Sequence, residues 1–367
     1  MKPTTLLRRT SARTLVATGL AASLLFAAGC AKSEDDESGG DSAASQDQAD
    51  AGQEVASDGD AGGRTCAIGA YGGEKLDLKH ATVGFSQSEK EANPFRIAET
   101  ASIKAEAEKR GVKLLTANAQ SQFSKQISDV QDLIAKGADL LVIAPLNSDG
   151  WEPVLRAAGA KHIPIVTIDR KINATACKDY VSFIGSDFVE QGRRAADRMI
   201  ETTGGKGKIA VLLGAAGNNV TTERTKGFQD RIAEKAPGLK VVFKQTGEFA
   251  REKGQQVTEQ LIQSKPDITG IYAENDEMGL GAVNALKGAG KKAGDVKIVT
   301  IDGTKGAVRG IVDGWIDGVI ESNPRFGPLA FKTLDAFTKG EKVSQDIVIK
   351  DSAYTKDNAK ADLNKAY

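Results

Sequence analysis

Histidine is scarce in this chain, and so are the motifs that bind nucleotides. Only two histidines, His80 and His162, occur in 367 residues, too few for an ordinary histidine-based metal site. The chain also lacks the Gly-x-x-x-x-Gly-Lys-Ser/Thr loop that cradles nucleotide phosphates. We therefore expect no metal, no cofactor and no nucleotide hydrolysis, and any active process must take its energy from partner proteins.

Net charge and aromatic residues are sparse as well. The 49 Lys and Arg residues balance the 49 Asp and Glu residues, which argues against nucleic acid as a partner. Aromatic residues make up 5% of the chain, so an aromatic residue at the end of a predicted strand is a feature to explain.

The first 30 residues are typical of an export signal. Lys2, Arg8 and Arg9 form a basic start, and residues 15–28 form an apolar stretch too short to span a membrane. The stretch ends at Ala27-Ala28-Gly29-Cys30, which resembles the bacterial lipoprotein box, although that box usually has Leu where this chain has Ala27. Cleavage there would make Cys30 a lipid-anchored first residue. A plain signal peptide is the alternative, and the Arg8-Arg9 pair leaves twin-arginine export open.

Residues 31–64 contain almost no large apolar side chain. Such a segment cannot bury enough surface to offset the entropy lost on ordering, and we expect a disordered tether. Beyond it lie two cysteines, Cys66 and Cys177. Because an exported location permits disulfides, we predict that these two are bonded and pin the N-terminal arm to the loop containing Cys177.

From residue 80 onward, strand-like and helix-like segments alternate. We predict strands at residues 82–86, 113–117, 140–144, 165–169, 181–185, 208–213, 240–245, 268–273, 298–302, 318–322 and 347–350. We predict helices at residues 95–110, 123–136, 152–160, 189–201, 222–235, 252–263, 277–289 and 305–313. This alternation favours parallel sheets covered by helices, and roughly eleven strands suit two doubly wound lobes better than one. No helix-turn-helix segment precedes His80, which argues against a DNA-binding repressor.

The sequence Ile-Val-Thr-Ile-Asp occurs twice, at residues 165–169 and 298–302. Each copy is an apolar β-branched run that ends in a carboxylate, the pattern of a buried parallel strand. Ligands bind outside the carboxyl ends of such strands, so Asp169 and Asp302 are candidates to contact one ligand from two sheets. An Asp after a strand is also a common helix cap or turn residue, which is the structural alternative for each.

Other polar and aromatic residues also follow predicted strands. They are Asn93, Phe95, Arg96, Arg170, Arg224, Phe249 and Asn275. Carboxylate, guanidinium and amide groups can each exchange several directional hydrogen bonds with a polyol, and an aromatic ring can stack on a sugar. Helix capping explains Asn93 and Asn275 equally well, and Arg224 suits an ordinary helix position. Capping alone does not favour two Phe and three Arg at strand ends.

With these motifs in view, the chain resembles the type I periplasmic binding proteins for sugars, the receptors of ABC importers. The resemblance covers about residues 81–350 and is carried by Asn-Pro-Phe, Ile-Asp-Arg, Glu-Arg-Thr-Lys-Gly-Phe, Glu-Asn-Asp-Glu-Met and Ile-Asp-Gly. Glu99 and residues 107–111 and 150–155 are most similar to the galactofuranose-binding branch, as is Arg96. Asn93-Pro94-Phe95 is more similar to the ribose branch. Ser322 stands where the ribose branch has a Gln.

The resemblance implies two α/β lobes, each a doubly wound parallel sheet, joined by a hinge of three crossing strands near residues 185–187, 322–323 and 347–350. One lobe is expected to comprise residues 80–185 and 323–347, and the other residues 186–322 and 348–367. The expected ligand contacts are Asn93, Phe95, Arg96, Asp169 and Arg170 from one lobe, Arg224, Phe249, Asn275 and Asp302 from the other, and Ser322 near the hinge.

The expected function is that of a monomeric receptor, lipid-anchored outside the bacterial cell membrane, which closes on one monosaccharide and delivers it to an ABC permease. Galactofuranose, another furanose or pentose, and a hexose all remain open as ligands. A sensor that presents sugar to a chemoreceptor or kinase would need the same site. An exported glycoside-acting enzyme could use Asp169 and Asp302 as an acid–base pair, but the sequence shows no obvious partner that would raise the pKa of either.

Overall fold

The computed structural model describes residues 53, 55–57 and 63–367. The expected signal segment 1–30, its lipidation site Cys30 and most of the expected tether 31–64 lie outside these residues. Three residues of that tether, Val55–Ser57, form the edge strand β1, which pairs antiparallel with β14, Asp346–Ile349. Here the expectation of disorder is wrong, because a strand edge offers backbone partners that composition does not reveal.

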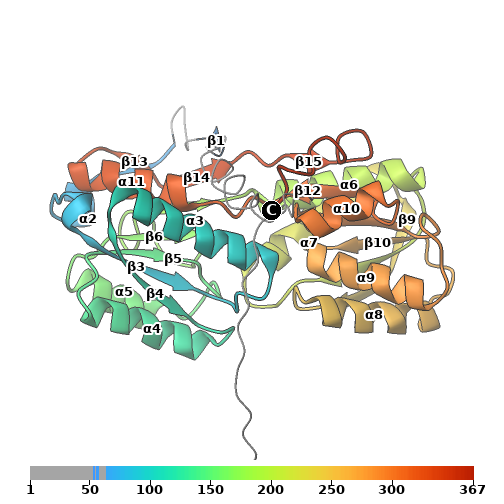
Figure 1. The fold of residues 1–367 in the computed structure, drawn as a ribbon, viewed down its shortest axis with the longest axis horizontal. Helices are drawn as coiled ribbons and strands as arrows, with labels where there is room; N and C mark the ends of the chain where they lie inside the picture. The colour runs from blue at the N-terminus through green and yellow to red at the C-terminus, as the bar shows by residue number, and fades with distance from the viewer. Residues whose placement is uncertain (1–52, 54, 58–62) are drawn as a thin grey trace, which may run out of the picture. The chain divides into compact units, whose positions relative to one another are not determined.

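The first lobe is built on a seven-stranded sheet with helices on both faces (Figure 1). Its order is β1-β14-β7-β6-β5-β3-β4, and β14 to β4 are all parallel. The strands are β3 Thr82–Gln87, β4 Lys113–Asn118, β5 Leu140–Ile143, β6 Ile165–Ile168 and β7 Ser182–Gly185. One face is covered by α3 Pro94–Arg110 and α11 Gly327–Lys339, and the other by α4 Phe123–Ala135 and α5 Glu152–Gly159.

The second lobe repeats this plan on a six-stranded sheet of order β15-β12-β11-β10-β8-β9. Its strands are β8 Lys206–Leu213, β9 Gly238–Thr246, β10 Gly270–Ala273, β11 Lys297–Asp302, β12 Gly318–Glu321 and the antiparallel β15 Ala353–Tyr354. Helices α6 Phe188–Thr203 and α7 Asn219–Lys235 pack on one face. Helices α8 Arg251–Ser264, α9 Asp276–Gly288 and α10 Lys305–Val312 pack on the other.

The predicted fold class is confirmed, and every predicted strand and helix occurs with ends within three residues of those expected. Helix α11 was missed, although Phe331, Leu334 and Phe337 have the spacing of a buried helix face. The remaining unpredicted elements are all short: β1, β2 Thr65–Cys66, α2 Ile68–Tyr71, the 3-10 turn η1 Leu78–His80, β13 Val343–Ser344 and β15. Segments this short have no hydrophobic periodicity to detect.

Both sheets contain the same doubly wound strand order. The order is β4-β3-β5-β6-β7 in the first lobe and β9-β8-β10-β11-β12 in the second. In each lobe the chain passes from the first strand of the set to a neighbour on one side, β3 to β4 and β8 to β9. The next strand, β5 or β10, lies on the other side of the first, and the chain continues away from it. The loops after β3 and β5 therefore leave in opposite directions, and so do those after β8 and β10. The carboxyl ends at such a switch point leave a crevice where ligands bind.

Three segments pass between the lobes. They connect β7 to α6 at residues 186–187, β12 to α11 at residues 322–326, and β14 to β15 at residues 350–352. Strand β14 pairs with β7 as far as Val348, so residues 348 and 349 belong to the first sheet, whereas the expected boundary placed them in the second lobe.

A disulfide joins Cys66, on β2, to Cys177, in the loop between β6 and β7, with an S–S distance of 2.10 Å. The bond that the sequence predicted is therefore present, with Cys66 buried in the first-lobe core and Cys177 half-buried against it. Within residues 53, 55–57 and 63–367, no helix combines the length and the apolar character needed to cross a membrane.

Candidate ligand-binding site

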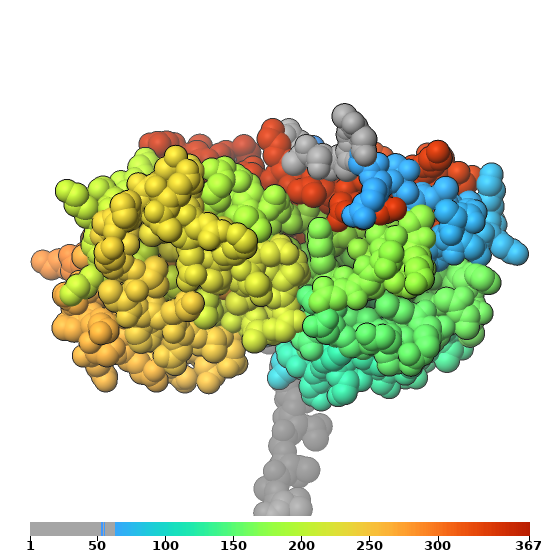
Figure 2. Space-filling model, turned by 180° about the vertical axis from the view of Figure 1, so that it is seen from behind, coloured from blue at the N-terminus to red at the C-terminus, as the bar shows by residue number. Residues whose placement is uncertain are grey.

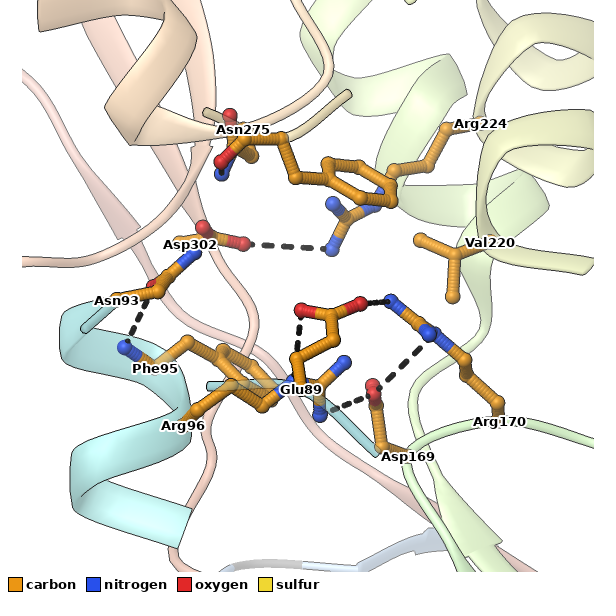
Figure 3. Close-up of a pocket in the computed structure, with 11 residues that line it drawn as sticks. Glu89, Asn93, Phe95, Arg96, Asp169, Arg170, Val220, Arg224, Asn275 and Asp302 are labelled. Carbon is orange, nitrogen blue, oxygen red and sulfur yellow. Dashed lines mark hydrogen bonds and ion pairs between the residues drawn. The ribbon is translucent and has the colours of Figure 1, made fainter. Parts of the chain in front are cut away.

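A pocket lies where residues of both lobes converge (Figure 3). The residues that line it are Glu89, Asn93, Phe95, Arg96, Asp169, Arg170, Val220, Arg224, Phe249, Asn275 and Asp302. Three carboxylates, three guanidinium groups, two amides and two aromatic rings thus surround one small space.

The first helix after β3 places three of these side chains. Asn93 is the N-cap of α3, its Oδ1 accepting a hydrogen bond from the backbone N–H of Phe95 at 2.9 Å, and Pro94 follows in the first turn. Asn93 therefore has the capping role that the sequence suggested and also lines the pocket. The cap fixes the start of the helix, and this directs Phe95 and Arg96 to the carboxyl end of the sheet.

Arg96 and Arg170 are joined by a carboxylate that the sequence analysis did not single out. Glu89 accepts hydrogen bonds from Arg170 Nη2 at 2.6 Å and from Arg96 Nε at 3.2 Å. Burial alone would raise the pKa of Glu89, but the two guanidinium groups lower it to about 2. Glu89 is therefore ionised at neutral pH, and Figure 3 shows it between the two arginines.

Asp169 completes this ionic network. It accepts a hydrogen bond from Arg96 Nη1 at 2.8 Å, and the same nitrogen donates to Glu99 behind the pocket at 2.9 Å. Burial raises the pKa of Glu99 to about 7, against the opposing effect of Arg96. The first-lobe wall therefore combines two guanidinium groups with the carboxyl groups of Glu89 and Asp169.

One nitrogen on this wall has no acceptor. Arg170 is 2% exposed, and its Nη1 donates to the carbonyl oxygens of Leu146 and Pro145. Its Nε has no hydrogen-bond partner among the described residues and is 3.7 Å from Asp169 Oδ2. A buried donor left unpaired costs roughly 1–3 kcal/mol, so a ligand oxygen bound here would remove a penalty.

The second-lobe wall is arranged differently. Arg224, in the second turn of α7, donates through Nε to Gln191 at 2.9 Å and through Nη1 to the carbonyl of Glu274 at 2.5 Å. Its Nη2 faces Asp302 Oδ1 at 3.6 Å, beyond hydrogen-bond distance. Burial raises the pKa of Asp302 well above its ordinary value, and the charge of Arg224 opposes this incompletely.

Asn275 and Phe249 form the rest of this wall. Asn275 caps α9 through the N–H of Met278 at 3.0 Å, and its Nδ2 donates to the carbonyl of Phe249 at 3.1 Å. The Phe249 ring lies 5.8 Å from the Arg170 guanidinium of the other lobe. A Cβ on Gly214 would come within 2.0 Å of this ring, so only glycine leaves room for it.

Three residues that line the pocket have unusual backbone conformations. Asp169, Phe249 and Asp302 have φ of 63°, 59° and 147°, in a region that favours glycine. Such conformations cost on the order of 1–3 kcal/mol each and are typical of functional sites. Both copies of Ile-Val-Thr-Ile-Asp thus end in an Asp with positive φ, a backbone conformation that residues other than glycine seldom adopt.

The structure brings together nine of the ten residues expected to contact ligand. Ser322 is not among the lining residues: its N–H donates to the carbonyl of Asp302 at 2.8 Å from behind. Sequence analysis missed Glu89 and Val220. Glu89 lies in the loop two residues after β3 and four before the cap Asn93, so its place after a strand end was the signal that could have identified it.

Metal ligation has no support among the described residues, which contain no group of three His, Cys, Asp or Glu side chains placed to hold an ion. The chemistry of the pocket is hydrogen bonding. Each carboxyl is next to a guanidinium, and the two rings add apolar surface. This set suits a neutral, polyhydroxylated ligand because its charges are already balanced within the wall.

The lobes touch beside the pocket. The N–H of Ser148 donates to the carbonyl of Gly217 at 2.9 Å, and the N–H of Lys171 donates to Asn219 Oδ1 at 3.1 Å. Figure 2 shows the green surface of the first lobe adjoining the yellow surface of the second on this face. A larger groove shares Glu89, Asn93 and Phe249 with the pocket. The pocket is thus enclosed by loops of both lobes.

Comparison with known proteins places the chain in a family. Residues 83–342 match the periplasmic binding protein domain, and the chain belongs to this family. It is 35% identical to the galactofuranose-binding protein YtfQ of Escherichia coli, over 77% of this chain and 91% of that protein. It is 37% identical to the ribose import binding protein RbsB of Bacillus subtilis, over 73% of this chain and 85% of that protein.

A solved structure shares the fold and the degree of identity. The binding protein component of the arabinose ABC transporter from Shewanella sp. ANA-3, bound to α- and β-L-arabinofuranose, matches with a TM-score of 0.75 and 37% identity. The match covers 77% of this chain and 95% of that one. The resemblance drawn from the motifs is therefore confirmed at the level of family and fold.

Proposed function

We propose that this protein is an extracytoplasmic receptor that binds one monosaccharide between its lobes and delivers it to an ABC permease. The observation that carries the proposal is the pocket itself, in which Asp169, Arg96 and Arg170 of one lobe face Asp302 and Arg224 of the other. A ligand touching both walls is fully bound only when the lobes are together, so it favours the closed arrangement.

The ligand class follows from the pocket and from the relatives. Relatives and structural neighbours carry names or titles that refer to galactofuranose, ribose and arabinofuranose. A neutral furanose or pentose, or a hexose, suits a charge-balanced wall with several donors and acceptors.

Binding without catalysis is part of the proposal. Asp169 is hydrogen-bonded to Arg96, and Asp302 lies beside Arg224, so each carboxyl is held by a cation on its own wall. These contacts suit each Asp to accept sugar hydroxyls. Incubation of the purified protein with glycosides of the same sugars should release no product, and steady turnover would contradict this part of the proposal.

A thermal-shift screen against D-galactose, L-arabinose, D-ribose, D-fructose and D-xylose tests the binding function. A sugar present at 100 times its dissociation constant should raise the free energy of unfolding by about 2.7 kcal/mol. Calorimetry then gives the affinity and the stoichiometry, which should be one. If no neutral monosaccharide shifts the transition, the receptor proposal fails.

Membrane attachment and transport need separate tests. If Cys30 carries the lipid, the intact chain should fractionate with membranes and Cys30→Ser should not. Loss of uptake of the bound sugar in a strain lacking this protein, restored by the gene, supports delivery to a permease. Normal uptake together with loss of a sugar-dependent response would favour a sensor instead.

A further inference from the structure

One buried amide connects the pocket with the segments between the lobes. Gln191, on α6, is 1% exposed. Its Oε1 accepts the hydrogen bond from Arg224 Nε at 2.9 Å. Its Nε2 donates to the carbonyl of Glu321 at 3.2 Å, where β12 ends, and to Asp351 Oδ2 at 2.7 Å, in the third crossing segment. All hydrogen-bonding groups of the amide are therefore in use at once.

The chemistry of the neighbours fixes which end of the amide faces which way. Arg224 has donors and no acceptor, so the oxygen of Gln191 must face it. The Glu321 carbonyl and the Asp351 carboxyl accept, so the NH₂ group must face them. A carboxylate at position 191 would oppose two acceptors, and an apolar side chain would leave Arg224 Nε unpaired. An amide is the side-chain group that satisfies both ends.

Asp351 extends the chain of bonds to the first crossing segment. Its Oδ1 accepts from Ser186 Oγ at 3.2 Å, and its carbonyl accepts from Arg194 Nη1 at 2.8 Å. The neighbouring Ser352 N–H donates to Glu321 Oε2 at 2.9 Å. The residues around Gln191 thus include parts of the first and third crossings and the strand end that leads into the second.

The helices that contain Gln191 and Arg224, α6 and α7, pack closely against each other. A Cβ on Gly192 would lie 2.2 Å from the carbonyl oxygen of Arg224, and one on Gly227 would lie 2.0 Å from that of Val189. Backbone contact at two points holds α6 against α7 and places Gln191 within reach of Arg224. A shift of Asp351 during lobe movement therefore has to break its bond to Gln191, because α6 is held against α7 and β12 of its own lobe.

We propose that Gln191 is a positioning residue that couples sugar binding at Arg224 to the arrangement of the segments between the lobes. This inference rests on the proposed function, since it assigns a role within the same site. The outer nitrogen of Arg224 faces the pocket while its Nε is held by Gln191. Ligand contact on one side and the closed hinge on the other each fix the same guanidinium, so each favours the other.

Replacement of Gln191 by Met and by Glu tests this role, with Gln345→Met as the control. Gln345 is another buried amide, 9% exposed, which donates to the carbonyl of Thr65 far from Arg224. We expect both Gln191 variants to weaken binding of the sugar found in the screen by roughly 5- to 150-fold, the usual range of coupling between sites, and the control to bind normally. Small-angle scattering should show less compaction of the Gln191 variants at saturating sugar.

A rescue variant separates coupling from ordinary destabilisation. In Gln191→Glu with Asp351→Asn, the new amide at position 351 can donate to the new carboxylate, so part of the lost affinity should return. Asp351→Asn alone should bind nearly as the wild type does, because its amide oxygen can still accept from Gln191. Wild-type affinity and compaction in Gln191→Met and Gln191→Glu would overturn the inference, and so would failure of the rescue.

A measurement without sugar keeps this inference distinct from the proposed function. Hydrogen exchange at the N–H groups of Glu321 and Ser352, which bond across the second and third crossings, should be faster in Gln191→Met than in wild type and in Gln345→Met. Unchanged exchange would contradict the role of Gln191 even if sugar binds. If exchange changes but no sugar binds, the receptor function fails and the structural coupling stands.

Discussion

The two lobes present the same strand sequence to the pocket but hold its final Asp in different ways. In the first lobe, Asp169 accepts from Arg96 at 2.8 Å within an ionic network that includes Glu89. In the second, Asp302 is 3.6 Å from Arg224, and burial and the nearby Asp276 raise its pKa. An identical pentapeptide therefore does not fix the hydrogen-bond partners of its carboxyl. The side chains packed around it do so.

Partner chemistry explains the difference. The first-lobe carboxylates face two guanidinium groups. In the second lobe, two nitrogens of Arg224 already donate hydrogen bonds to Gln191 and to the carbonyl of Glu274. The charges of the first wall are thus paired before any ligand binds. The second wall has a buried acid, Asp302, that lies 3.6 Å from the nearest nitrogen of Arg224, beyond hydrogen-bond distance, and a ligand hydroxyl would add a partner there.

The largest expected effect comes from removing each Asp separately. Asp169→Ala and Asp302→Ala should each lower sugar affinity at least about 100-fold, because a carboxylate provides two hydrogen bonds of about 1.5–3 kcal/mol each. Isothermal calorimetry measures both. Near-normal affinity in both variants would refute the site.

The same two substitutions should also affect the stability of the protein differently in the absence of sugar. Asp169→Ala should reduce the free energy of unfolding by about 1–3 kcal/mol because it leaves Arg96 short of an acceptor. Asp302→Ala should reduce the free energy of unfolding less, since the desolvated carboxyl of Asp302 contributes little to stability. Equal destabilisation in chemical denaturation would remove the proposed difference between the lobes.

Glu89→Gln should have the next largest effect. A Gln can accept from one arginine with its oxygen, but its NH₂ group then faces the other, so the first wall loses a charged bridge. We expect roughly tenfold weaker binding, consistent with the loss of one charge-assisted hydrogen bond. Glu277→Gln is the control, because its partner Arg251 is 43% exposed and such a pair contributes at most about 1 kcal/mol. If both variants bind alike, Glu89 is not part of the site.

The response to pH should come from buried acids of both lobes, Glu99 in the first and Glu274 and Asp276 in the second. Burial raises the pKa of Glu274 from 4.5 to about 7 and that of Asp276 from 3.8 to about 6. These groups bind protons more tightly in the folded protein, so the stability linked to them is full below about pH 4 and is lost as pH rises to about 7. Glu89 acts in the opposite sense, losing its contribution as pH falls from 4.5 to about 2.

Calorimetric scans of the sugar-free protein from pH 4 to 8 check this response. The melting temperature should fall with rising pH, and Glu274→Gln should flatten the fall, since an amide keeps an acceptor for the Gly214 N–H and does not titrate. Glu277→Gln should leave the slope unchanged. A melting temperature that rises across this interval in the wild type would show that the buried acids of both lobes are ionised throughout.

The smallest effect on binding should come from the disulfide. Among the described residues the bond lies in the first lobe, between positions 111 apart in sequence. Cys66→Ser with Cys177→Ser should lower the free energy of unfolding by about 2–5 kcal/mol yet change sugar affinity less than about threefold, because the bond stabilises chiefly through the unfolded chain. A large loss of affinity would show that the first wall depends on this cross-link.

Much of the fold was accessible to sequence reasoning, for identifiable reasons. Strands such as β5 and β11 are continuous apolar runs bounded by turn residues, and helices such as α4 have a clear apolar face. Short edge strands such as β1 and β15 depend on partners far away in sequence, and no local pattern reveals them. The sequence of α11 did contain the periodic signal, so this helix was predictable and was missed.

The site residues also separate into those that sequence patterns identified and those that they did not. Residues directly after strands, such as Asp169, Asn275 and Asp302, were found because the carboxyl ends of parallel strands meet at one edge. Glu89 follows the end of β3 by two residues and was overlooked although the same reasoning applies to it, whereas Gln191 lies inside a helix at a position that no local pattern marks. Their importance arises from what they touch.

The sequence by itself determined the two α/β lobes, the strand-end positions of the pocket side chains and the pairing of Cys66 with Cys177, because periodicity, turn residues and residue counts are local or additive properties. The tertiary structure alone decided that Asp169 lies in a balanced ionic network, that Asp302 is a desolvated acid, and that Gln191 joins Arg224 to the crossing segments. The physical reason is that pKa values and hydrogen-bond partners depend on burial and on distances between groups far apart in sequence, which only the packed chain establishes.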